Sequence, residues 1–207
     1  MRRALEGYAR VLRHRTSVGY AMVIALNFGC LFAYVSGSSL VLIGILGVSR
    51  RVYGLLFAVT SFGLMVGALS NASLSRRGVS HARLIAWGMG IIVVTSVLLL
   101  ALTLVGAISA WTLVSLAVAG FVGQGIVRPN AVQGALEPVP ESAGVASAVV
   151  SGLQMLVGGV SSAIVAAWFD GRSAIAVTTM MALTALASLT VYGFVVRPAE
   201  LSRGQSR

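Results

Sequence analysis

The sequence LIAWGMGIIVVTSVLLLALTL, residues 84–104, contains no charged side chain. About 20 apolar residues in helical conformation are needed to cross the hydrocarbon core of a bilayer. A surface helix of a soluble protein would instead carry a polar face over this length. The stretch therefore predicts a transmembrane helix.

Five similar stretches accompany it along the chain. The six predicted spans are approximately 18–43, 52–74, 83–104, 108–127, 143–168 and 172–196. The four prolines, at positions 129, 138, 140 and 198, fall at or beyond the ends of these spans. Because proline disrupts the interior of a helix, we expect these residues to mark span ends.

The composition supports the same class of protein. Hydrophobic residues make up 57% of the 207 residues and charged residues only 10%, and the mean hydropathy is +0.95. A soluble domain needs more polar surface than this. We expect an all-α integral membrane protein with a basic amphipathic cytoplasmic segment at 1–17, a six-helix transmembrane domain at 18–196 and a cytoplasmic tail at 197–207.

The net charge of +10 comes from arginines that lie between the apolar stretches. They form no basic face with interleaved aromatic residues, which argues against a nucleic-acid partner. With six spans, one side of the bilayer holds twelve arginines and the other side only Arg50, Arg51 and Arg172. By the positive-inside rule both termini are predicted to be cytoplasmic, with the chain in the bacterial inner (plasma) membrane.

The segment before the first span is itself patterned. Leu5, Tyr8 and Leu12 follow helical spacing, with arginines around them. This predicts a basic amphipathic helix lying on the cytoplasmic leaflet. An ordinary solvated linker explains the pattern equally well.

An internal repeat is visible in the positions of the spans. Span starts near 18, 52 and 83 recur near 108, 143 and 172, an offset of roughly 90 residues. Since three is an odd number, the second triplet would cross the bilayer in the opposite sense, as a 3+3 inverted repeat.

Side-chain amides agree with that division of the chain. They belong to spans one, two, four and five, and are Asn27, Asn71, Gln124, Asn130, Gln133 and Gln154. Amides are costly in lipid unless they have a partner or face a wet cavity. We expect those four spans to line a polar path and spans three and six to face lipid. The alternative for any single amide is hydrogen bonding between helices.

Three stretches together resemble a known family. They are FAYVSGSSLV at 32–41; YGLLFA at 53–58 with GALSN at 67–71 and RRG at 76–78; and PNA at 129–131 with AGVASA at 143–148 and GLQ at 152–154. They are similar to the bicyclomycin-resistance-type (Bcr/CflA-like) drug/proton antiporters of the major facilitator superfamily. The resemblance runs from about Tyr8 to Val195 and departs from the family pattern at Ser39, Asn71 and Arg128.

The resemblance implies a specific architecture and function. The chain would be the C-terminal six-helix half of a drug-efflux antiporter, whose cavity forms between two halves. The partner would be the missing N-terminal half or a second copy of this chain, beside the lipid bilayer and a small-molecule substrate. The alternatives are a substrate-binding membrane subunit of another transport system, or a truncated, non-functional remnant.

Six residues are the candidates for the substrate pathway: Asn27, Tyr34, Thr60, Gln124, Asn130 and Gln154. Asn130 is expected near the cytoplasmic mouth. The Tyr34 ring could stack on a planar or cationic drug, or could equally anchor the helix at the bilayer interface.

Two other sets of residues have competing interpretations. Asn71, Arg76, Arg77 and Gly78 match a cytoplasmic loop motif, which could latch a gate or, slightly favoured, only set topology. Gly144, Ala148 and Gly152 recur every four residues, which indicates close helix packing rather than a gating seam.

The predicted spans lack the groups that other chemistries need. They hold no Asp, Glu, His or Lys well inside, so the chain alone should not couple transport to protons through a buried side chain. Ser36-Gly37 invites an intramembrane serine protease, but both histidines lie outside the predicted spans, and we expect no enzyme. The single cysteine, Cys30, allows no disulfide or CxxC metal pair, and we expect neither a metal nor a cofactor.

Overall fold

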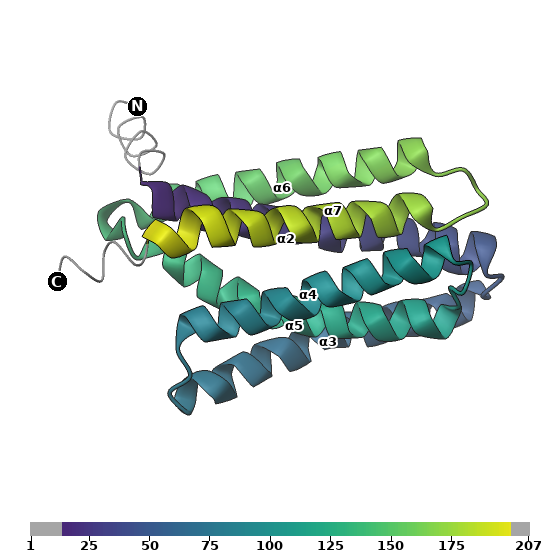
Figure 1. Ribbon diagram of the computed structural model, residues 1–207, viewed down its shortest axis with the longest axis horizontal. Coiled ribbons are helices and arrows are strands. Elements are labelled where there is room, and N and C mark those ends of the chain that lie inside the picture. The colour runs from purple at the N-terminus through teal and green to yellow at the C-terminus, as the bar shows by residue number, and fades with distance from the viewer. Residues whose placement is uncertain (1–13, 200–207) are drawn as a thin grey trace.

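The computed structural model describes residues 14–199, which are helical throughout apart from short connections and contain no strand (Figure 1). Nearly all of the predicted amphipathic segment at 1–17 and most of the tail at 197–207 lie outside the described residues. Within them, six helices are long and apolar enough to cross a bilayer. The predicted class, an all-α membrane protein of six spans, is confirmed.

The helix bounds follow the prediction closely, with one exception. The helices are α2 (Arg15–Ser39), α3 (Arg50–Arg76), α4 (His81–Leu104), α5 (Ala110–Leu136), α6 (Ala143–Trp168) and α7 (Ile175–Val191). A π-helical segment, Leu40–Ile45, continues α2, and another, Tyr192–Val196, continues α7; a short 3₁₀ turn, Pro140–Ser142, precedes α6. The exception is the fourth span, which was predicted to end at 127 and continues to Leu136.

Pro129 therefore lies inside α5, and the expectation that it marks a span end is wrong. A proline in a helix removes one backbone donor, but membrane helices tolerate this where neighbouring groups satisfy the backbone. Here the Asn130 side chain donates from Nδ2 to the Ile126 carbonyl, 2.7 Å away, one turn earlier in the helix. The proline sits next to a side chain that supports the same turn.

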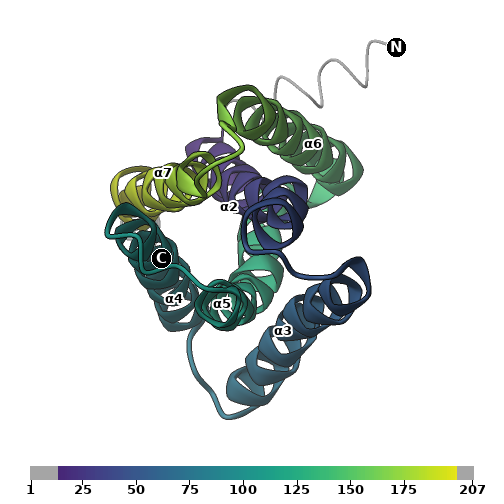
Figure 2. The same ribbon diagram turned by 90° about the vertical axis from the view of Figure 1, so that its right-hand side faces the viewer.

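The helices form a ring of four with two flanking helices. Figure 2 shows α2, α7, α4 and α5 around a square, with α6 outside α2 and α3 outside α5. The contacts agree: α2 packs against α6, α7 and α5, whereas α5 packs against α3, α4 and α2. The start of α2 and the end of the last helix lie at the same end of the bundle (Figure 1).

The two helix triplets, α2–α4 and α5–α7, make equivalent contacts with each other. The middle helix of each triplet, α3 or α6, packs against the first helix of the other triplet, α5 or α2. The third helices, α4 and α7, pack against each other and each also against the first helix of the other triplet. A 3+3 inverted repeat requires such pairing; the repeat itself stays a prediction.

The burial of the helices differs from the expected division between polar path and lipid. The most apolar 18-residue window is 44% buried in α4 and in α7, but only 17% in α3 and 28% in α6. Spans three and six, which are α4 and α7, are thus not the exposed helices within this chain, because they are two of the four helices of the ring. The exposed helices are α3 and α6.

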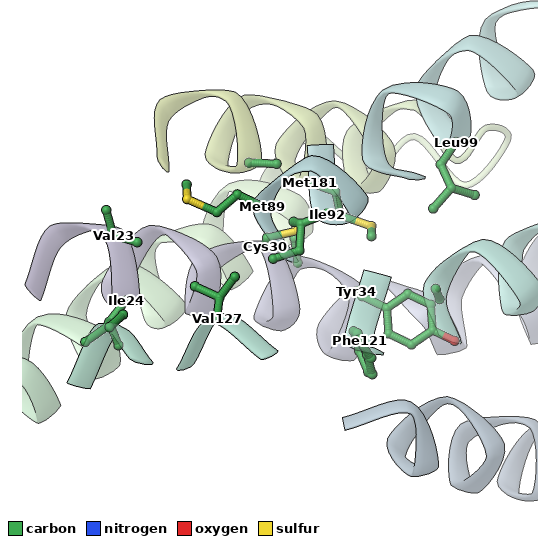
Figure 3. Packing of buried hydrophobic residues seen from close by; sticks show 14 of the residues in the cluster. Val23, Ile24, Cys30, Tyr34, Met89, Ile92, Leu99, Phe121, Val127 and Met181 are labelled. Atoms are coloured by element: carbon green, nitrogen blue, oxygen red, sulfur yellow. The ribbon is translucent and has the colours of Figure 1, made fainter. Parts of the chain in front are cut away.

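The centre of the ring is filled with apolar and sulfur-containing side chains. Figure 3 shows Cys30 of α2 among Met89 and Ile92 of α4 and Met181 of α7. Cys30 is 3% exposed, and its Sγ lies 3.7 Å from the Ser96 hydroxyl. The cysteine is a packing residue, as expected from its place in an apolar stretch.

The helices α3 and α5 pack so closely that their backbones are in contact. A Cβ added at Gly63 would lie 2.7 Å from the Val118 carbonyl oxygen, and one at Gly67 would lie 2.9 Å from the Gly125 Cα. The four buried residues of α3 are Thr60, Gly63, Gly67 and Asn71, which form one narrow strip. Small residues allow this approach, as is usual between membrane helices.

The loop between α6 and α7 is held by one carboxylate. Asp170 Oδ1 accepts from the backbone N–H groups of Arg172 and Ser173, each at 2.9 Å, and Gly171 adopts a positive φ of 72°. These donors, first that of Arg172 and then that of Ser173, hold the pKa of the Asp170 carboxyl below its ordinary value. The ionised form therefore favours the folded loop.

We predict that Asp170→Asn lowers the melting temperature at neutral pH and has no effect in acid. A carboxyl whose pKa is lowered by folding stabilises the protein above its ordinary pKa and loses that effect as pH falls through the lowered value. Thermal unfolding of both proteins from pH 7 down to about pH 3 checks this. An equal difference in melting temperature at all pH values would contradict it.

Candidate functional site

One pocket opens on the side of α2 and α5 that α4 and α7 leave uncovered. Its polar lining residues come from three helices: Asn27 of α2, Gln124 and Arg128 of α5, and Gln154 of α6. The remaining walls are apolar, and are Ile24, Phe28, Leu31, Leu64 and Val127. Three of the six candidate pathway residues are thus brought together.

The three amides lie at the same depth in the bundle. Gln154 is at the middle of the span Pro140–Trp168, and Asn27 and Gln124 are within about 5 Å, along the axis, of the middle of theirs. Their exposed fractions are 6–7%. The Asn27 Nδ2 group is buried without a hydrogen-bond partner, and a polar group in that condition costs free energy until a ligand or water occupies the pocket.

Arg128 is the unexpected member of the pocket. The sequence placed it in a loop after the fourth span, but α5 continues for two more turns beyond it, to Leu136. It lies about 8 Å from the middle of α5 along the axis, within the ~15 Å half-thickness of a hydrocarbon core. The error came from assuming that Pro129 ended the helix.

Tyr34 and Thr60 do not line this pocket. The Tyr34 side chain is fully buried, and its ring meets Phe121 of α5 edge-on at 5.3 Å between centroids (Figure 3). The Thr60 hydroxyl donates to the Phe57 carbonyl at 2.7 Å in its own helix. In this conformation the Tyr34 ring has no free face for a planar or cationic drug, and it packs in the core rather than at a bilayer interface.

Asn130, the sixth candidate, belongs to a separate polar cluster nearer the end of α5. Its Nδ2 donates to Asn71 Oδ1 of α3 at 2.6 Å, and its Oδ1 lies 2.7 Å from His81 Nδ1. Since the amide oxygen can only accept, His81 must carry a proton on Nδ1. The cluster connects α3, α4 and α5.

Only part of this cluster could be predicted from the sequence. Asn71 is predicted in the second span and is on α3, where it is 9% exposed. His81 is predicted in a loop, but it is the first residue of α4. A signal for the contact was present, because polar residues near the ends of adjacent membrane helices commonly bond to each other. Their pairing across the sequence could not be read from a single chain.

We predict that Asn130→Leu destabilises the protein by about 1–2 kcal/mol, because it removes three hydrogen bonds and leaves Asn71 and His81 without this partner. Gln133→Leu, at an exposed position one turn further along α5, is the control and should change stability little. Thermal unfolding in detergent measures both. Equal melting temperatures for the two variants would count against the cluster.

The loop motif ends α3 as a tight turn. Gly78 has a φ of 80°, and the Val79 N–H donates to the Leu74 carbonyl at 3.2 Å, a hydrogen-bond pattern that favours glycine at this place. Arg76 and Arg77 are exposed, and neither forms an ion pair with another residue within 14–199. The gate-latch interpretation therefore has no partner within the described chain.

The strip Gly144, Ala148 and Gly152 does not pack against another helix within residues 14–199. All three residues are exposed, and a Cβ added at Gly144 or Gly152 would meet nothing within 4 Å. The glycine that does meet a neighbour on α6 is Gly158, beside Phe28 of α2. Close packing of the strip, which would need a helix outside residues 14–199, stays a prediction.

Comparison with known proteins adds two relatives. A protein of Haemophilus influenzae (strain ATCC 51907 / DSM 11121 / KW20 / Rd), named bicyclomycin resistance protein homolog, is 28% identical over 182 residues, which cover 87% of this chain and 45% of the relative. The uncharacterized MFS-type transporter YdgK of Bacillus subtilis (strain 168) is 28% identical over 187 residues, 88% of this chain and 45% of the relative. No protein-family model matches the chain.

The chain is similar to part of an MFS-type transporter. It spans about half the length of the curated relatives it matches. The resemblance found in the three sequence stretches is confirmed by relatives with corresponding names. Among residues 14–199, no three His, Cys, Asp or Glu side chains are grouped so that they could hold a metal ion.

Proposed function

We propose that the chain is one six-helix half, the C-terminal one, of an MFS-type transporter that moves small molecules across the membrane. The observation that carries this proposal is the convergence of Asn27, Gln124 and Gln154 on one pocket at mid-depth of three spans. Amides at that depth are costly unless they bind each other, water or a ligand. Asn27 Nδ2 binds none of the described side chains.

A second six-helix unit would cover the pocket by packing on α3 and α6. Each of these helices has an exposed small-residue strip: Gly54, Ala58, Ser61, Ala68 and Ala72 on α3, and Gly144, Ala148, Ser151, Gly152 and Gly159 on α6. Residues one turn apart share a helix face. Ala68 follows the pocket residue Leu64 by one turn, and Ser151 precedes Gln154 by one turn.

Most of the large exposed side chains of α3 lie on a different stripe and suit lipid. They are Val52, Leu55, Val59, Phe62, Val66 and Leu69, with exposed fractions of 38–66%. Met65, which is 47% exposed, is the exception, because it lies one turn from Ser61 and from Ala68 on the small-residue strip. A membrane helix with a small-residue face and a large apolar face packs by the small one. The partner is the missing N-terminal half or a second copy of this chain.

We propose that the chain lies in the plasma membrane with both ends in the cytoplasm. The concentration of arginines on one side of six spans supports this orientation by the positive-inside rule. With Arg128 inside the span, the remaining asymmetry is eleven against three.

Drug efflux by proton antiport is the activity we propose for the assembled transporter. One relative is named for resistance to bicyclomycin, and resistance can arise from export. The acids Glu137, Glu141 and Asp170 lie at or beyond helix ends here, so a proton-coupling acid would come from the second unit. The protein would be a carrier and not an enzyme.

Co-expression tests the proposal directly. The chain is expressed in drug-sensitive bacteria together with the part of the Haemophilus influenzae relative that it does not match, and bicyclomycin accumulation is measured. We expect accumulation to fall only when both are present and to recover with Gln124→Leu or Gln154→Leu, but not with Gln133→Leu. Unchanged accumulation despite confirmed membrane insertion of both parts would favour a non-functional remnant or a binding subunit.

A further inference from the structure

Arg128 places a permanent positive charge about 8 Å from the middle of α5, within the thickness of a hydrocarbon core. It lines the pocket beside Gln124, one turn earlier in α5. Arginine keeps its proton under all relevant conditions. No carboxylate of residues 14–199 forms an ion pair with it, and none lines the pocket. A charge at this depth is costly without a counter-charge.

The other polar groups of the pocket can also donate. Asn27 Nδ2 is buried, lines the pocket and has no partner. The Gln124 and Gln154 amides each add two donor hydrogens and one acceptor. With one guanidinium, three amides and no acid, the pocket has a surplus of donors and a positive charge over apolar walls.

We propose that this pocket selects organic anions: an apolar or aromatic body would contact Phe28, Leu31 and Leu64, and a carboxylate or sulfonate would face Arg128 and Asn27. This rests on the proposed function and names the substrate class for the same site. Guanidinium pairs with planar oxyanions through two parallel hydrogen bonds, which gives both energy and orientation. A cation would meet Arg128 with no compensating acid.

Two other negative groups could meet Arg128. A lipid headgroup phosphate is one, since Arg128 lies about 8 Å from the middle of its helix and the ~15 Å half-thickness of the core leaves about 7 Å for its side chain to span. A carboxylate of the second unit is the other. A second copy of residues 14–199 would bring no such group at this depth, because the acids of these residues lie at or beyond the helix ends. We assign the site to a soluble organic anion.

Binding of three size-matched probes to the purified chain tests the assignment. The chain is placed in phosphatidylcholine nanodiscs and titrated calorimetrically with naphthalene-1-carboxylate, naphthalene-1-carboxamide and naphthalen-1-ylmethylammonium. We expect the carboxylate to bind about tenfold to a hundredfold more tightly than the amide, as one charge-assisted hydrogen bond allows. The ammonium should bind most weakly.

Variants assign the preference to the pocket. Arg128→Gln should bring the carboxylate down to the affinity of the amide, Arg128→Lys should keep most of the preference, and Arg172→Gln, in the loop between α6 and α7, should keep all of it. Suppose that the probes bind and that Gln124→Leu lowers their affinity, but that the carboxylate is not preferred. This result would overturn the anion assignment and leave the transport pocket intact. If no probe binds, or Gln124→Leu changes nothing, the pocket itself is refuted.

Two further titrations distinguish the possible sources of the negative charge that faces Arg128. The titration is repeated with phosphatidylglycerol in the nanodisc, and again with the chain co-purified with its co-expressed second half. Persistence of the carboxylate preference in both supports a soluble anion. Its loss with phosphatidylglycerol would assign Arg128 to a lipid headgroup, and its loss in the pair would assign Arg128 to an acid of the second unit; either result overturns the proposal.

Discussion

Gly67→Val is expected to destabilise the isolated chain by about 3 kcal/mol, at the upper end of the cost of overpacking. A Cβ at this position would meet the Val122 carbonyl group and the Gly125 Cα of α5. These are backbone atoms of a helix, so they cannot turn aside as a flexible side chain can. The helices α3 and α5 would have to separate, and the Asn71–Asn130 contact one turn away would be lost with them.

Gly54→Val is the matched control for this effect. Gly54 is on the same helix, and a Cβ there meets nothing within 4 Å. The two variants make the same chemical change and have similar effects on helix propensity, so only the neighbour differs. Thermal unfolding in detergent, followed by gel filtration, should show early unfolding for Gly67→Val alone. Similar behaviour of both variants would contradict the close crossing of α3 and α5.

Ala148→Trp is expected to abolish transport by the assembled protein while leaving the chain folded. Ala148 is exposed at the centre of the small-residue strip of α6. Membrane helices pack closely where both present small residues. An indole at position 148 would therefore hold the second unit away from the pocket face. The isolated chain should unfold at the same temperature as the wild type.

Leu156→Trp provides the control on the same helix. Leu156 is 63% exposed and is large already, so an indole adds little bulk and should be tolerated by lipid. Co-purification of the tagged chain with the co-expressed second half, together with the accumulation assay, should separate the two variants. Co-purification of Ala148→Trp at wild-type yield would show that this strip is not the contact surface.

The number of spans and most of their bounds could be predicted because lipid imposes one requirement on every span. A segment such as 84–104 is long, apolar and uncharged, and no tertiary contact is needed to recognise it. The fourth span was the failure, since Pro129 normally ends a helix in water. In α5, the Asn130 side chain and the neighbouring helices support the turn, and a rule derived from isolated helices does not include them.

The candidate site was predicted in part for a similar reason. Amides in apolar segments are costly, so Asn27, Gln124 and Gln154 stood out, and the structure brings them together. Tyr34 stood out too, but its direction around α2 depends on Phe121 of α5, which is 87 positions away in the sequence. The strip on α6 has the spacing of a packing surface, yet no helix among the described residues packs on it, and spacing alone cannot identify the partner.

Reaction of a cysteine at position 154 with a water-soluble thiol reagent tests the central claim most directly. In a Cys30→Ala background with the second half co-expressed, Gln154→Cys and Leu156→Cys are exposed to 2-sulfonatoethyl methanethiosulfonate from either side of the membrane. The account predicts that the cysteine at 154 reacts from at least one side and that the cysteine at 156, on the other side of α6 from position 154, does not. Protection of both positions, or equal reaction of both, would contradict a polar pathway through this pocket.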